Sequence, residues 1–102
     1  MRNVDPDVAG AVRLAARELA RRRPGRAVEL RVPPVTAVQL GAATGGATHR
    51  RGTPPAVVEM DADTFLALVN GLLTWADAIA TYRVAASGAH ADLGDLFPLT
   101  AP

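Results

Sequence analysis

Several residue types that support catalysis, cross-linking or membrane insertion are absent or scarce in this chain of 102 residues. It contains no cysteine, which excludes disulfides, thiolate chemistry and cysteine-ligated metal sites. Its two histidines, His49 and His90, have no spacing that resembles a metal site. No apolar run approaches the roughly 18 to 20 residues of a membrane-spanning helix, and the polar start of the chain does not resemble a signal peptide. We therefore expect a cytoplasmic protein without a cofactor, a bound metal or an integral membrane segment.

Charge is nearly balanced, with 11 basic residues, all of them arginine, against 10 acidic ones. A net charge of +1 provides no basic excess of the kind that nucleic-acid binders carry. Hydrophobic residues make up 49% of the chain, which is typical of a globular domain rather than a disordered segment. We expect a single domain over residues 1–102, and no nucleic-acid partner.

The N-terminal half predicts one helix followed by short strands. Apolar residues recur at helical spacing over residues 3–23, with Asp5 as the N-cap and Pro6 at the first helical position. Pro24-Gly25 then ends the helix. Alternation of apolar and polar residues, interrupted by proline and glycine, predicts strands at 28–32, 35–40, 47–51 and 56–60.

The C-terminal half is predicted to be mainly helical. Asp61 is a suitable cap for a first helix, and Thr74 for a second, shorter one. A strand candidate follows at 83–87, and residues 91–97 predict one or two final helical turns. This order predicts an α/β (α+β) fold, with a mixed, mainly antiparallel sheet of about five strands and helices packed on one face.

The same half carries an ordered series of short motifs. A strand ending in an acidic cap enters a helix with the core Phe65-Leu66-Ala67-Leu68, and a Gly71-x-Leu73 corner, a second helix and a strand ending at Gly88 follow. Together these motifs resemble the sterol carrier protein domain. Two further stretches resemble, more narrowly, the small actinobacterial sterol-carrier-like proteins: Arg51-Gly52-Thr53-Pro54-Pro55 and the ending from Ala91 to Leu99.

The resemblance implies lipid binding and lipid transport without catalysis. The ligand would be a lipid or another apolar or amphipathic small molecule, such as a fatty acid, an acyl-CoA or a sterol, held between sheet and helices. The candidate ligand-binding residues are the apolar ones on the two helices and the terminal turn: Phe65, Leu68, Val69, Leu72, Trp75, Ile79, Leu93, Leu96 and Phe97. The same stripes also fit an ordinary packed core, and a small domain has little apolar material to spare for a cavity.

One polar cluster lies beside a turn that contains glycine. Arg50 and Arg51 could bind the phosphate or carboxylate of a lipid head group, because guanidinium groups pair with both. A basic loop exposed to water is the simpler interpretation of the same residues.

Catalytic interpretations find little support. Asp61 and Asp63 at a helix start are explained by capping and the helix dipole, and Ser87 and His90 lie in no nucleophile motif. We therefore expect no enzyme activity. Two alternatives to a ligand carrier remain open: a structural or interaction module that forms a homodimer, and an accessory domain related to the C-terminal part of mycothiol-dependent isomerases.

Overall fold

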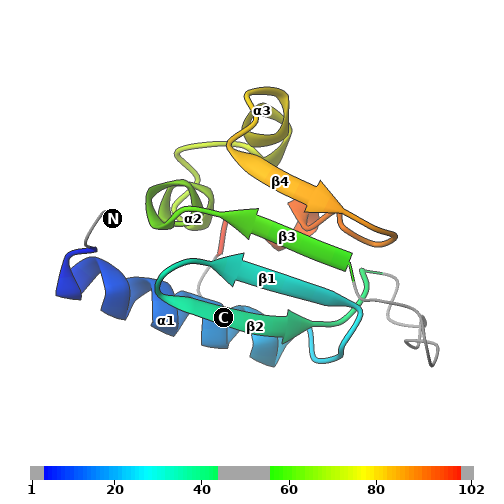
Figure 1. Ribbon diagram of the computed structural model, residues 1–102, viewed down its shortest axis with the longest axis horizontal. Helices are drawn as coiled ribbons and strands as arrows, with labels where there is room; N and C mark the ends of the chain where they lie inside the picture. The colour runs from blue at the N-terminus through cyan, green and yellow to red at the C-terminus, as the bar shows by residue number, and fades with distance from the viewer. Residues whose placement is uncertain (1–3, 44–55, 100–102) are drawn as a thin grey trace.

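A computed structural model describes residues 4–43 and 56–99. These residues form an α+β fold, which confirms the predicted class (Figure 1). The sheet has four strands among the described residues rather than about five, and the candidate strand at 47–51 lies outside them. The elements in chain order are α1 (Pro6–Arg22), β1 (Val28–Val32), β2 (Thr36–Leu40), β3 (Ala56–Met60), α2 (Ala62–Val69), α3 (Trp75–Ala80), β4 (Val84–Ser87) and a short 3-10 helix, η1 (Gly94–Leu96).

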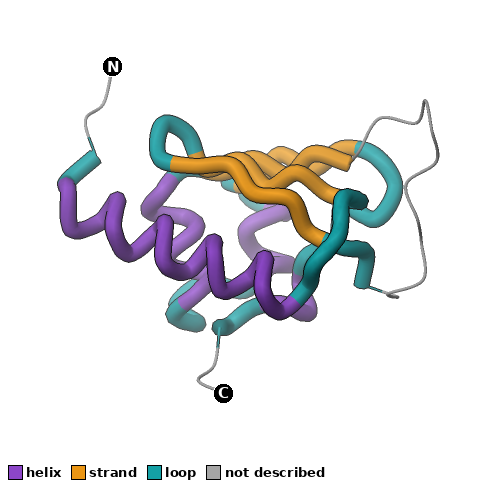
Figure 2. Tube along the Cα trace, turned by 90° about the horizontal axis from the view of Figure 1, so that it is seen from below, coloured by secondary structure: helices purple, strands orange, loops and turns teal. Residues whose placement is uncertain are grey.

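The strands form one open sheet in the order β2-β1-β3-β4. The central pair, β1 and β3, is parallel, whereas β1 with β2 and β3 with β4 are antiparallel. The helices lie on one face of this sheet, and Figure 2 shows the two layers edge-on. The predicted mixed, mainly antiparallel sheet with helices on one face is confirmed.

Alternation of side chains along the strands assigns one face of the sheet to the core and the other to water. Val28, Leu30 and Val32 of β1 are buried, while Glu29 and Arg31 between them point to the opposite face. Arg31 pairs there with Glu29 on the same strand, so the open face is polar and solvated.

Side-chain caps begin the three α-helices as the sequence predicts. Asp5 Oδ1 accepts the Asp7 N–H at 2.8 Å, and Asp61 Oδ1 accepts the Thr64 N–H at 2.8 Å. Thr74 Oγ1 accepts the backbone N–H three residues on, at 3.1 Å. Each bond satisfies a backbone donor that the first helical turn leaves unpaired.

The core lies between the helices and the inner face of the sheet. Val12 and Leu19 of α1, Phe65 and Leu68 of α2, and Leu93 before η1 are fully buried there. Helix α1 packs against both β2 and α2, and Figure 1 shows α2 crossing α1 with its axis turned away from that of α1. A groove lies on the outer surface of the domain, where α1 meets α2.

Candidate functional site

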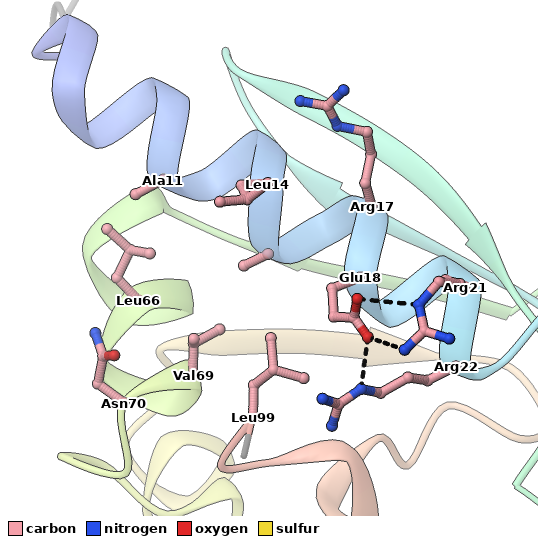
Figure 3. A pocket seen from close by; sticks show the side chains of 11 residues that line it. Ala11, Leu14, Arg17, Glu18, Arg21, Arg22, Leu66, Val69, Asn70 and Leu99 are labelled. Carbon is pink, nitrogen blue, oxygen red and sulfur yellow. Dashed lines mark hydrogen bonds and ion pairs between the residues drawn. The ribbon is translucent and has the colours of Figure 1, made fainter. Parts of the chain in front are cut away.

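A groove of about 860 Å³ lies between α1, α2 and the C-terminal segment (Figure 3). This volume falls within the roughly 300–1,000 Å³ that small-molecule sites usually have. Its walls are apolar toward α2 and charged toward the end of α1. The lining residues are Ala11, Leu14, Ala15, Arg17, Glu18, Arg21, Arg22, Leu66, Val69, Asn70 and Leu99.

Residue size and one long-range hydrogen bond shape the apolar part of the groove. Ala11 and Ala15 face it from α1, and their short side chains leave the space open. Leu99 forms a third wall, because its N–H donates to the Val69 carbonyl at 2.9 Å and thereby holds the C-terminal segment across the end of α2. Figure 3 shows Leu99 beside Val69, facing the charged end of α1.

The charged end is organised around Glu18. Its carboxylate accepts hydrogen bonds from Arg21 Nε at 3.0 Å, from Arg21 Nη2 at 2.5 Å and from Arg22 Nε at 2.8 Å. Spacings of three and four residues place these groups on one side of the helix. The Arg17 guanidinium points away from this cluster in Figure 3. Three arginines and one glutamate give the groove a net charge of +2.

Hydrogen bonds from Arg21 and Arg22 lower the pKa of Glu18 from 4.5 to about 2. Because the folded-state pKa is the lower one, the stability contributed by these pairs is fully present above about pH 4.5. It is lost as the pH falls through about 2. We expect an NMR titration of the Glu18 carboxyl carbon to give a midpoint near pH 2, and near pH 4.5 in an Arg21→Ala/Arg22→Ala variant. A wild-type midpoint near 4.5 would contradict the pairing.

The predicted ligand-binding residues of the two helices occupy different environments. Phe65 and Leu68 are fully buried in the core. Val69 lines the groove. Leu72 is 82% exposed in the turn after α2, and Ile79 on α3 is 38% exposed.

The remaining predicted residues are Trp75 on α3 and three residues in and beside η1. Leu93 is fully buried, and Leu96 is partly buried against the core. The Phe97 ring meets Phe65 edge-on and stacks on Trp75, with 6.2 Å between ring centroids in each pair. The role of these side chains in ligand binding stays a prediction.

Of the groove's lining, only Val69 belongs to the ligand-binding residues predicted from the sequence. One signal was available in Leu14, an apolar residue between Arg13 and Arg17 on the side of α1 opposite its buried stripe. Leu99 carried no such signal, since its place depends on a contact with Val69 thirty positions earlier.

Three other predictions concern a head-group site, metal binding and a membrane span. Arg50 and Arg51, the candidate head-group residues, lie outside the described residues. Over residues 4–43 and 56–99, no three histidine, cysteine or acidic side chains gather where they could hold a metal ion. No helix described here has the length and apolar character to cross a membrane.

The described residues form a small α+β domain with a groove between its two longest helices. The model of the bacterial SCP ortholog family matches residues 5–99. The chain belongs to that family and is a sterol carrier protein-like domain. A comparison with curated proteins gives no match.

Proposed function

We propose that this protein binds a lipid-like molecule in the groove between α1 and α2, without changing it chemically. The observation that carries the proposal is an apolar trough that ends at a group of arginines. A molecule with a hydrocarbon chain and an anionic head, such as a fatty acid, matches both parts. Membership of the bacterial SCP ortholog family supports a carrier role.

The hydrocarbon chain would lie along the apolar walls. Leu66, Val69 and Leu99 offer aliphatic surface on the α2 side, and Leu14 offers it from α1. Covering these side chains removes apolar surface from water, at about 25 cal/mol per Å². Val69 is the residue that this site shares with the set predicted from the sequence.

The anionic head would lie at the end of α1. Arg21 and Arg22 already hold the Glu18 carboxylate, which shows that this surface accommodates a carboxylate among several guanidinium donors. Because the lining has a net positive charge, a second anion gains attraction there despite Glu18. A neutral sterol would gain nothing from this end.

Filling the groove tests the proposal. Ala11→Trp places a large ring in the trough from an exposed helix position, so we expect the domain to fold while affinity for cis-parinaric acid falls by about tenfold or more. Probe fluorescence with competition by unlabelled fatty acid measures the affinity. Ala76→Trp, at an exposed position on α3 outside the groove, is the matched control and should bind like the wild type. Equal binding by both variants would place the ligand elsewhere.

A further inference from the structure

The solvent side of α1 carries a line of residues that do not pack in the core. Gly10, Leu14, Arg17 and Arg21 follow one another at spacings of four, three and four, so they lie along one side of the helix. We propose that this stripe docks an acidic amphipathic helix of a partner protein. The proposal does not depend on a lipid filling the groove, although Leu14, Arg17 and Arg21 also border it.

Leu14 is the apolar anchor of the stripe. The face of α1 that packs in the core is made by other residues, including Val12, Ala16 and Leu19. Leu14 lies away from that face and is 67% exposed. A partner helix with an apolar ridge would cover it and, beside it, the apolar walls of the groove.

Gly10 is a second feature that the isolated domain does not explain. It lies inside α1, where glycine weakens a helix relative to alanine. Apart from the helix's own neighbouring backbone, no atom of the described residues comes within 4 Å of the position that a Cβ would take, so packing among them does not require glycine. On an outer helix face, a missing side chain lets another backbone approach closely.

Charge selects the chemistry of the partner. Arg17 forms no hydrogen bond or ion pair within the described part of the chain, and the neighbouring Arg13 is also exposed. The one acid between Gly10 and Arg22 is Glu18, which Arg21 and Arg22 already hold. The surface therefore presents arginines beside Leu14 that are complementary to carboxylates on a partner.

The same observations disfavour two other occupants. A second copy of this chain would bring a second set of arginines to the contact, with only the already paired Glu18 of each copy to offset their charge. An anionic bilayer attracts arginines, yet interfacial helices bind by burying an apolar face, and that face of α1 is packed in the core. An acidic amphipathic helix would cover Leu14 with its apolar side chains and pair its carboxylates with the arginines.

The probe for this proposal is a helical peptide of about 18 residues, with leucine at heptad spacing, glutamate at the positions beside the leucines, and alanine and glutamine elsewhere. Its control replaces every glutamate with lysine. Fluorescence anisotropy of the labelled peptides should show saturable, salt-sensitive binding of the glutamate peptide alone. Equal binding of both peptides, or no binding of either at about 1 mM, would overturn the proposal.

Substitutions in the protein test whether the peptide binds at the stripe. We expect Arg17→Ala/Arg21→Ala to weaken peptide binding about tenfold, since it removes two ion pairs at the edge of a contact. Arg26→Ala/Arg31→Ala removes the same charge from exposed positions outside the stripe and should leave binding unchanged. Circular dichroism confirms folding, and unaltered binding by the first variant would exclude the stripe.

Two further measurements identify the competing occupants. Sedimentation of the lipid-free protein would reveal a dimer, and flotation with phosphatidylglycerol vesicles would reveal membrane binding. The proposal is wrong if the glutamate peptide fails to bind and Arg17→Ala/Arg21→Ala abolishes the dimer or the vesicle binding. The stripe would then bind a second copy of the chain or a membrane. Because all peptide measurements use lipid-free protein, they stand apart from the fatty-acid test of the groove.

Discussion

Replacing Phe65 with alanine is expected to lower the free energy of unfolding by about 3–5 kcal/mol, the range for deleting a buried aromatic ring. Phe65 is fully buried, and its ring meets Phe97 edge-on. The loss has two parts: the transfer free energy that burial of the ring contributes, and the cost of the cavity that its removal leaves. Domains of this size have a total stability of about 5–15 kcal/mol, so this one substitution removes a large part of it.

Urea unfolding followed by circular dichroism measures the change, and Trp75 provides a second signal because it stacks on Phe97. Leu72→Ala is the control. Leu72 is 82% exposed, so its truncation should change stability by less than about 0.5 kcal/mol.

The result also separates two interpretations that the sequence left open, a packed core and a ligand cavity. A loss in the expected range identifies Phe65 as core. A loss below about 1 kcal/mol, accompanied by a loss of fatty-acid binding, would instead identify Phe65 as lining an internal ligand site.

Local patterns in the sequence were sufficient for the elements and for the class of fold. The alternation of Val28, Leu30 and Val32 predicts both a strand and its buried face, because successive side chains point to opposite sides. Asp5 and Asp61 mark helix starts, since only the first turn of a helix leaves backbone N–H groups free to donate to a side-chain oxygen.

Apolar spacing alone could not show where side chains would lie in the tertiary structure. Leu72 continues the helical series from Phe65 and Leu68, yet α2 ends at Val69 and Gly71 turns the chain at a φ of +75°. Leu72 therefore lies in the turn, away from the buried face of α2. The groove could not be predicted from the sequence for a related reason. Periodicity shows which face of a helix is apolar, but it does not show which helices pack against one another.

A second large effect is expected where two connecting segments cross. A Cβ on Gly41 would lie 2.3 Å from the Pro24 carbonyl oxygen and 3.2 Å from its carbon. The Gly41 N–H also donates to the Arg23 carbonyl at 2.8 Å, which fixes the backbones at this distance. Both clashing atoms belong to the main chain, so no side-chain rotation relieves them. We expect Gly41→Ala to destabilise the protein by at least about 2 kcal/mol.

The same substitution at Gly10 should have the opposite sign. Beyond the backbone of α1 itself, none of the residues that the structure describes lies within 4 Å of the added methyl group, and alanine favours the helix by about 0.5–1 kcal/mol over glycine. At about 4–8 °C per kcal/mol, thermal unfolding should show Gly41→Ala lower by about 8 °C or more and Gly10→Ala higher by about 2–8 °C. An unchanged melting temperature in Gly41→Ala would mean that the segments after α1 and β2 do not touch. A gain at Gly10 would show that the stability of the isolated domain does not require this glycine.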